Sequence, residues 1–302
     1  MKRILVTGAT GFIGRHTLPI LLASGYEVHA ISFNGEQPQM GPLRWHRADL
    51  LDPVAAANLI AAVAPSHLLH FAWYAVPGKY QSSEENFRWC QAGIELLLAF
   101  ARSGGERAVF AGTCFEYDLR QGYCSEELTP CAPATRYGQC KLALAQLVTR
   151  CPPGGLSTAW GRVFYLYGPH EPPSRLVPSV ILSLLRGERV RCTHGRQVRD
   201  FLHVEDVASA FVALLESGAR GVVNIASGEP ITVRSIVERA AALLDATGRI
   251  DFGAIEAAPN DPLAVLATTG RIRGETGWSP CWSLDDGLAA TIDWWRAQSP
   301  RR

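Results

Sequence analysis

The 302-residue sequence predicts an α/β fold, a doubly wound parallel sheet covered by helices on both faces. Two observations carry this prediction. In the first half of the chain, short apolar runs of buried-strand type alternate with stretches whose apolar residues follow helical spacing. A glycine-rich turn directly follows the first apolar run and opens the first helical stretch. Since strand, helix and strand in succession form right-handed crossovers, we expect the strands to be parallel.

The individual elements follow in chain order. The apolar runs predict strands at residues 4–6, 28–31, 68–71 and 108–111. The first helix is expected to end at Gly25. The second begins at Asp52 and Pro53, because Asp is a favoured N-cap and Pro fits the first helical position. Two longer helices are predicted over residues 83–102 and 135–150, where they would flank the sheet.

A smaller and more irregular C-terminal lobe is expected after the main sheet. Proline-rich stretches at residues 152–153 and 169–178 break the alternation, and at the second the chain is predicted to leave the sheet. The strand-like run 222–225 indicates that the chain later returns to it. We therefore expect a first domain of residues 1–165, re-entered around residues 200–225, and a partly interleaved lobe of residues 166–302.

Composition and charge exclude several classes of protein. Apolar residues make up 47% of the chain and charged residues 19%, which is a globular composition. The 29 Lys and Arg nearly balance the 28 Asp and Glu, and neither sign forms a tract, so we expect no binding to nucleic acid or to a membrane surface. The eight cysteines include no C-x-x-C pair, and the histidines lack metal spacing. These patterns indicate reduced thiols, a cytoplasmic location and no metal site.

The glycine-rich turn has the spacing G-x-x-G-x-x-G between a strand and a helix. Glycines there allow a tight turn and let backbone N–H groups approach a pyrophosphate at the helix N-terminus. This context is typical of a Rossmann-type dinucleotide-binding domain. The alternative is a strand-to-helix turn without a ligand. The turn residues expected to touch a cofactor are Gly8, Thr10, Gly11, Phe12, Ile13 and Gly14.

The end of the second strand is expected to select between NAD and NADP. A carboxylate there would bind the ribose hydroxyls of NAD and repel a 2′-phosphate, but the strand ends at Ser32 and no acidic residue follows before Glu36. Arg15 is either a cation for the 2′-phosphate or a solvated residue of the first helical turn. These features favour NADP, with NAD as the alternative. Asp49, followed by Leu50, could bind the adenine amino group or be a plain loop carboxylate.

A tyrosine and a lysine provide candidate chemistry. Tyr137 and Lys141 are four residues apart at the start of a predicted helix, so both side chains project from one face. An ammonium group one turn away stabilises a phenolate and lowers the pKa of the phenol, which could then exchange a proton with a sugar hydroxyl or carbonyl. Upstream, a predicted strand ends at Thr113, whose hydroxyl could donate to the same substrate oxygen.

With these motifs the sequence resembles the extended short-chain dehydrogenase/reductase family, whose members act on nucleotide-sugars. The resemblance implies that Thr113, Tyr137 and Lys141 form a catalytic triad, with Lys141 also holding the nicotinamide ribose. Arg199 would bind the nucleotide phosphates of the substrate, or alternatively form a surface salt bridge. The motifs that carry the resemblance are residues 7–14, Asp49-Leu50, His70-Phe71-Ala72, Thr113, Tyr137 with Lys141, Tyr167-Gly168-Pro169, residues 199–203 with Asp206, and Asn224.

Departures from the family patterns narrow the expected reaction. The dehydratases place an acid and a base directly after the catalytic Thr, where this chain has Cys114 and Phe115, and Phe cannot transfer a proton. Epimerase-reductases resembling GDP-fucose synthase place Cys and His where this chain has Phe115 and Arg175. We expect Cys114 to be a packing residue.

The substrate side also departs from the 4-epimerases of the family. Their Asn on the long helix is replaced around Trp89, and their substrate-binding Asn by Tyr165. Trp73 lies in an aromatic loop that either shapes the substrate cleft or packs as a hydrophobic corner. The expected substrate contacts are therefore Trp73, Tyr165, Arg175 and Arg199.

The resulting hypothesis is an NADP-dependent reductase of a nucleotide-linked 4-keto-sugar. Residues 1–165 would bind the dinucleotide and residues 166–302 the substrate. The alternatives are a 4-epimerase that retains NAD and, in another class, a dinucleotide-sensing regulator without catalysis. The two long helices carry more apolar positions than one sheet-facing stripe needs, and with the resemblance this predicts a homodimer. Those positions are Ile94, Leu97, Leu98, Leu142, Leu144 and Leu147.

Overall fold

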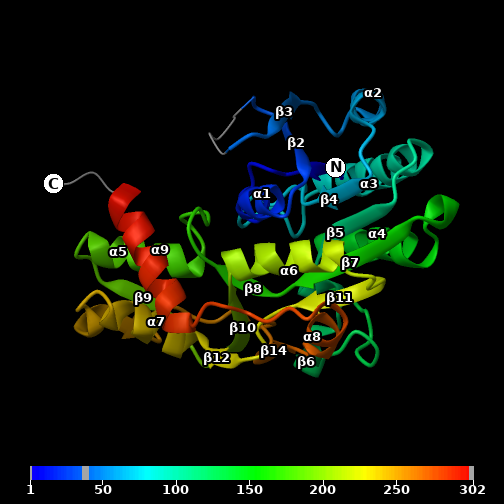
Figure 1. Cartoon of the computed structure of the whole chain (residues 1–302). Coiled ribbons are helices and arrows are strands. Elements are labelled where there is room, and N and C mark those ends of the chain that lie inside the picture. Colours follow the sequence, from blue (N-terminus) through cyan, green and yellow to red (C-terminus); the bar gives the residue numbers. More distant parts are fainter. Residues whose placement is uncertain (1, 36–40, 299–302) are drawn as a thin grey trace.

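A seven-stranded parallel sheet forms the centre of the molecule (Figure 1). The computed structural model describes residues 2–35 and 41–298. The strand order is β11-β7-β5-β4-β1-β2-β3, and every neighbouring pair is parallel. The strands are β1 (Arg3–Thr7), β2 (Glu27–Ser32), β3 (Arg44–Arg47), β4 (His67–His70), β5 (Arg107–Thr113), β7 (Ser157–Val163) and β11 (Gly221–Ile225). This architecture confirms the predicted doubly wound α/β fold.

Helices cover both faces of this sheet. One face carries α1 (Gly14–Ala23), α6 (Val204–Glu216) and α8 (Gly270–Thr276). The other face carries α2 (Pro53–Val63), α3 (Glu85–Arg102) and α4 (Arg136–Arg150). Local signals account for their ends, since the Asp52 carboxylate caps α2 by accepting from Val54 N and Ala55 N, and Gly25 takes a φ of +80° after α1.

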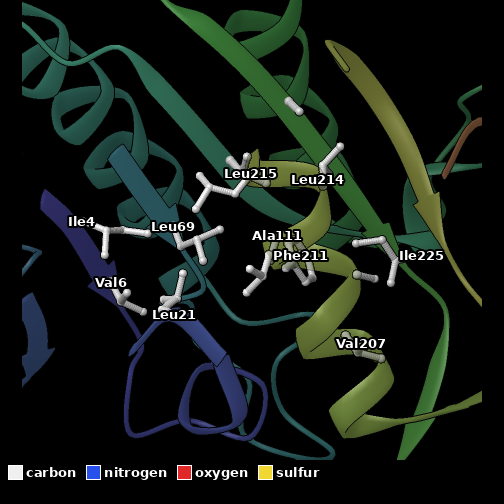
Figure 2. Close-up of a cluster of buried hydrophobic side chains, with 14 of the residues drawn as sticks. Ile4, Val6, Leu21, Leu69, Ala111, Val207, Phe211, Leu214, Leu215 and Ile225 are labelled. Atoms are coloured by element: carbon white, nitrogen blue, oxygen red, sulfur yellow. The ribbon is translucent and has the colours of Figure 1, made fainter. Parts of the chain in front are cut away.

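The layer between the sheet and α6 is an apolar core (Figure 2). Val207, Phe211 and Leu214 project from α6 toward the sheet, where they meet the side chains of several strands. Ile4 and Leu69 come from the central strands β1 and β4 and are fully buried. Central parallel strands are buried on both faces, which explains why they read as continuous apolar runs in the sequence.

The C-terminal lobe contains two smaller sheets. In one, the order is β12-β10-β14-β6, with β8 paired to β10; in the other, β13 pairs with β9. The strands are β6 (Tyr123–Cys124), β8 (Tyr165–Tyr167), β9 (Val190–Cys192), β10 (Val198–His203), β12 (Pro230–Thr232), β13 (Ile250–Phe252) and β14 (Ala264–Ala267). The helices are α5 (Leu176–Leu185), α7 (Val233–Ala242) and α9 (Leu284–Gln298). Short 3-10 helices are η1 (Cys114–Glu116), η2 (Leu119–Gln121), η3 (Pro153–Gly155) and η4 (Thr247–Arg249).

The chain passes between the two parts more than once. After β7 it enters the second sheet with β8, passes through α5, β9 and β10, and returns to the main sheet with α6 and β11. It then leaves again through β12 and α7. The C-terminal lobe is therefore interleaved with the main sheet. No helix in residues 2–35 or 41–298 combines the length and apolar character that crossing a membrane requires.

Candidate active site

A cavity of about 860 Å³ lies at the carboxyl ends of the main-sheet strands, and the C-terminal lobe forms its opposite wall. In open parallel sheets this edge, near the point where strand order reverses, is where ligands bind. Here the order reverses at β1, whose two neighbours are β2 and β4. The predicted site residues on the cavity wall are Gly8, Thr10, Gly11, Phe12, Ile13, Gly14, Asp49, Leu50, Phe71, Ala72, Trp73, Thr113, Tyr137, Lys141, Tyr165, Arg175 and Arg199.

The glycine-rich turn fits a dinucleotide pyrophosphate. Gly8 takes a φ of +65°, and a Cβ atom there would lie 2.7 Å from Ala72 N, so only glycine fits. A Cβ atom on Gly14 would overlap the Gly8 carbonyl oxygen. The N–H groups of Phe12 and Ile13 donate to no acceptor in the described part of the chain. Unused N–H groups at the start of α1 form the kind of anion-binding cradle that the cofactor requires.

Two predicted cofactor residues do not reach the cavity wall. The Arg15 guanidinium donates to Thr10 O from Nε (3.2 Å) and Nη2 (2.6 Å) and contacts His170 Nδ1 through Nη1. Arg15 therefore links the glycine-rich turn to His170 of the C-terminal lobe by hydrogen bonds. Because side chains alternate along β2, Ser32 faces the α1 side of the sheet. It is only 2% exposed. The next residue, Phe33, lines the cavity instead. Glu36 lies outside the described residues.

The residues after β3 and β4 form the next part of the wall. The Asp49 side chain accepts a hydrogen bond from Leu51 N at 2.9 Å, within its own turn. Leu50 is buried in the core beneath α2 and α3, and still borders the cavity. Phe71 and Ala72 follow β4 directly and also line it. Strand ends thus bring these segments together, although they are far apart in the sequence.

The predicted triad converges on one side of the cavity. Thr113 ends β5, and Tyr137 lies in the first turn of α4, which Thr135 caps by accepting from Gly138 N. The Thr113 hydroxyl lies beside the Tyr137 phenol and favours its ionised form. Lys141 is 3% exposed, and its Nζ donates to Ala111 O at 2.8 Å. A substrate oxygen placed near the two hydroxyls would meet a proton donor and a hydrogen-bond donor.

The pKa values of the pair depart from expectation. Burial raises the pKa of Tyr137 well above its ordinary value, and nearby Tyr80 adds to this effect, while the Thr113 hydroxyl opposes it. Burial lowers the pKa of Lys141 to about 7, against the opposing influence of the Glu116 carboxylate. The lowered phenol pKa expected from the sequence is therefore not found, because desolvation outweighs any effect of the neighbouring ammonium group.

Glu116 is a buried carboxylate beneath the triad that the sequence analysis missed. It is fully buried and accepts from Thr113 N (2.8 Å), Trp160 Nε1 (2.9 Å) and Arg162 Nε (2.7 Å). Thr113 and Glu116 also form a capping box around η1, a pattern that the spacing T-x-x-E could have revealed. Through these hydrogen bonds Glu116 fixes the backbone at the end of β5, where Thr113 lies.

The two residues after Thr113 offer no proton-transfer group. Cys114 is 2% exposed, and burial raises the pKa of its thiol, so it is a packing residue, as expected. Phe115 lines the cavity with a ring that carries no proton. An acid and base pair of the dehydratase type is therefore not formed at these positions.

The lobe side of the cavity holds two arginines. Arg199 is buried; its Nη2 pairs with Asp261 Oδ1 at 2.5 Å, and its Nη1 donates to Val198 O at 2.9 Å. Tyr165 lies under the Arg199 guanidinium at 5.2 Å, and Arg175 lies 5.3 Å from the Tyr80 ring. Arg199 thus combines a salt bridge with a place on the cavity wall. Sequence reasoning missed its partner, because 62 residues separate the two.

Glu171 is a second acidic residue on the lobe side that the sequence analysis missed. It is 7% exposed, borders the cavity, and its Oε2 has no hydrogen-bond partner in the described part of the chain. Burial raises the pKa of this carboxyl to about 8, although Arg175 opposes the shift. The raised pKa favours the neutral carboxyl, which can donate a hydrogen bond. Within the described residues no group of three metal-ligating side chains is found.

Comparison with known proteins identifies the family. The sequence model of the NAD dependent epimerase/dehydratase family matches residues 4–226. This chain belongs to that family. As the sequence motifs implied, it is an enzyme of the extended short-chain dehydrogenase/reductase type.

Members of the family resemble the chain over nearly its whole length. The dTDP-glucose 4,6-dehydratase of Streptomyces griseus is 30% identical, over 97% of this chain and 93% of its own. The UDP-glucose 4-epimerase of Rhizobium meliloti is 28% identical, over 99% of this chain and 98% of its own. Among solved structures, MoeE5 in complex with UDP-glucuronic acid and NAD has a TM-score of 0.85 and 31% identity, covering 98% of this chain and 100% of that one.

Proposed function

We propose that the protein reduces the keto group of a nucleotide-linked 4-keto-sugar, with Thr113, Tyr137 and Lys141 as its catalytic residues. The observation that carries this proposal is the convergence of the triad with the glycine-rich turn in one cavity. The second wall of that cavity presents Arg175 and Arg199, which suit the phosphates of a nucleotide-sugar.

The proposed roles follow from the geometry. When bound, the nicotinamide cofactor supplies the hydride. Tyr137 gives its phenolic proton to the carbonyl oxygen, which thereby becomes a hydroxyl group. Thr113 donates a hydrogen bond to the same oxygen as negative charge develops on it, and Lys141 holds the nicotinamide ribose and supplies a positive charge. Trp73 and Tyr165 provide apolar walls for the sugar.

We propose NAD as the cofactor. Arg15, the cation that would have favoured a 2′-phosphate, is engaged with Thr10 and His170. MoeE5 and the UDP-glucose 4-epimerase of Thermus thermophilus, 26% identical to this chain, are both complexes with NAD. The expected NADP preference rested on Arg15 and Ser32 and has no further support. The turn residues Gly8 to Gly14, with Asp49, Leu50, Phe71 and Ala72, would contact the cofactor.

We favour reduction over epimerisation because of the side chains that line the cavity. A 4-epimerase removes and returns hydride on one face of the cofactor, so its keto-sugar must turn over within the site. Large aromatic side chains line this cavity, and we expect them to restrict such a rotation. They are Trp73, Tyr80, Trp89, Phe115 and Tyr165.

The second candidate function is a 4-epimerase, which the UDP-glucose 4-epimerases among the relatives favour. The deciding experiment uses the purified protein. For the reductase we expect NADH to be consumed in proportion to an added 4-keto-6-deoxy nucleotide-sugar, with transfer of deuterium from labelled NADH. Bound NAD, interconversion of UDP-glucose and UDP-galactose, and no net NADH consumption would contradict the reductase. No turnover of either substrate would contradict both candidate functions.

The two parts of the chain have different proposed roles. Residues 1–165, with the segment around 200–225, would bind the dinucleotide, since they contain the seven-stranded sheet and α6. The rest of residues 166–302 would bind the substrate. We also propose a cytoplasmic location, supported by eight unpaired cysteines.

We propose a homodimer formed through α3 and α4. Two of the leucines expected at that surface, Leu97 and Leu144, are buried within the chain, whereas Leu147 is 41% and Phe87 59% exposed. For Leu147→Glu we expect sedimentation to shift from a dimer to a 32.8 kDa monomer. The matched control is Val54→Glu, at a 67% exposed apolar position on α2, which should leave the dimer intact. A monomeric wild-type protein at micromolar concentration would contradict the proposal.

A further inference from the structure

The Lys141 ammonium group lies near the faces of two indole rings. Its Nζ lies 3.8 Å from the ring centre of Trp73 and 5.6 Å from that of Trp160. The aliphatic stem is buried, and one N–H donates to Ala111 O at 2.8 Å. An ammonium group over the face of an indole is attracted by the negative face of the ring, and this attraction grows when water is excluded.

The nearer indole is fixed in place by an asparagine. Trp73 Nε1 donates to Asn86 Oδ1 at 2.8 Å. Asn86 is fully buried in the first turn of α3, and its Nδ2 donates to Tyr80 O (2.6 Å) and Ser83 O (2.8 Å). The amide therefore has partners on both ends, and the plane of the Trp73 ring has little freedom to turn.

The Trp73 ring also contacts the tyrosine of the triad. The ring centres of Trp73 and Tyr137 are 6.3 Å apart in an edge-to-face arrangement, and Tyr80 meets the Tyr137 ring in the same manner at 4.9 Å. One indole thus touches both Lys141 and Tyr137. Nothing in the motif that defines the triad requires an aromatic residue at position 73.

We propose that Trp73 is a positioning residue of the active site, whose indole face, oriented by Asn86, keeps the Lys141 ammonium group charged and in place beside Tyr137. This inference rests on the proposed function, in which Lys141 acts as a cation. In this role Trp73 orients Lys141, in addition to lining the part of the cavity proposed for the sugar.

The charge of Lys141 depends on few other groups. From η1 the Glu116 carboxylate favours the charged form, although it is shared with Arg162 of β7. Cys90 of α3 and buried His70 of β4 also face the ammonium group, the latter with a pKa lowered to about 3 and so neutral. Tyr137 lies one turn before Lys141 on α4. Because burial opposes the charge, the pKa of Lys141 responds directly to loss of the indole face.

The proposal can be tested by NMR titration of ¹³C-labelled lysine. The chain has only three lysines, Lys2, Lys79 and Lys141, so the third signal is assigned from its loss in Lys141→Met. In Trp73→Leu we expect the pKa of Lys141 to fall by about one unit relative to wild type. In Trp73→Phe we expect a smaller fall, because the phenyl face retains part of the attraction. Since Phe and Leu bury similar apolar surface, the difference between these variants isolates the aromatic face.

Two further variants complete the test. Asn86→Ala, which frees the indole N–H, should lower the pKa of Lys141 by less than Trp73→Leu does. Trp89→Leu removes another indole from the cavity wall, one for which no cation–π contact to Lys141 is found among the described residues, and it should leave the pKa of Lys141 unchanged. An unchanged or raised pKa in Trp73→Leu, or equal values for the Phe and Leu variants, would overturn the proposal.

Turnover provides an independent readout. In Trp73→Leu the loss of kcat with rising pH should begin about one pH unit lower than in wild type, in parallel with the NMR titration. Wild-type turnover in both Lys141→Met and Tyr137→Phe would refute the proposed function while leaving the NMR result valid. Conversely, if those variants are inactive and Trp73→Leu titrates like wild type, only the role of Trp73 fails.

Discussion

The two walls of the cavity differ in how their buried charged side chains are paired. On the sheet wall, formed by the ends of β4, β5 and β7 with the start of α4, Glu116 and Arg162 are almost wholly buried and paired with each other. On the lobe wall, formed by residues 165–177, 193–201 and 261, Arg199 is buried but its partner Asp261 is 34% exposed. Glu171 on the same wall has an oxygen without a partner. On the sheet wall the buried Glu116 and Arg162 are paired, although His70 Nε2 at the end of β4 has no partner among the described residues. The lobe wall keeps charged groups available to a ligand.

This difference is consistent with separate roles for the two walls, catalysis for the sheet wall and substrate recognition for the lobe wall. Chemistry requires donors and charges that do not move when the reaction occurs, and interlocked partners on strand ends provide this. Recognition of a flexible nucleotide-sugar requires groups that exchange one partner for another, and Arg199, whose partner Asp261 is partly exposed, provides this. The predictions below test whether disturbing the sheet wall damages catalysis and stability more than disturbing the lobe wall.

The largest effect is expected from Tyr137→Phe on the sheet wall. It removes the phenolic proton and little else, so kcat should fall by roughly two to four orders of magnitude. Binding of NADH, measured by its fluorescence, should change little. Turnover within a few-fold of wild type would show that the sheet wall does not hold the proton donor.

The next largest effect is expected from Arg162→Met. It leaves the Glu116 carboxylate buried without its cation, which should lower the free energy of unfolding by about 3–5 kcal/mol in urea denaturation. The matched variant on the lobe wall is Arg199→Met. Its partner Asp261 can be solvated after the change, and we expect a loss of only about 1 kcal/mol. Equal losses in the two variants would remove the distinction between the walls.

A smaller effect, visible as a pH dependence, is expected from Glu171→Gln. The carboxyl has a pKa raised from 4.5 to about 8 in the folded protein, so the folded state binds its proton more tightly than the unfolded state. Its contribution to stability is fully present below pH 4.5 and is lost as pH rises to about 8. Gln stays neutral, so the variant should lose less stability than wild type between pH 5 and 9. Parallel pH profiles in urea denaturation would mean that Glu171 is already ionised when folded.

The smallest effect is expected from Arg199→Lys. Lysine keeps the charge but loses the planar fork that grips a phosphate with two hydrogen bonds. We expect the KM for the nucleotide-sugar to rise about tenfold, equivalent to about 1.4 kcal/mol, with kcat nearly unchanged. A large fall in kcat at constant KM would instead assign the lobe wall to the chemistry.

Local features of the chain were predictable because their causes are local. The apolar runs marked the strands β1, β2, β4 and β5, and the Asp52 cap marked the start of α2. The i, i+4 spacing of Tyr137 and Lys141 placed both on one face of α4, and the glycine turn needed only its own backbone geometry. By contrast β7, in which Gly161 and Arg162 interrupt the apolar residues, was not predicted. The short strands of the lobe were not predicted either.

What only the tertiary structure decided depends on contacts between distant segments. The sequence could not show that Arg15 bonds to His170, 155 residues away, or that Ser32 faces α1 while Phe33 meets the cavity. Burial likewise raises the pKa of Tyr137, whereas the sequence predicted a lowered pKa. Desolvation depends on every group that packs around the phenol, and these groups come from distant parts of the chain. The sequence by itself determined the fold class and the family, and it predicted the triad residues. The hydrogen-bond partners, the side-chain orientation and the charge of each residue depend on how the sheet and the lobe pack together. Only the tertiary structure decided them.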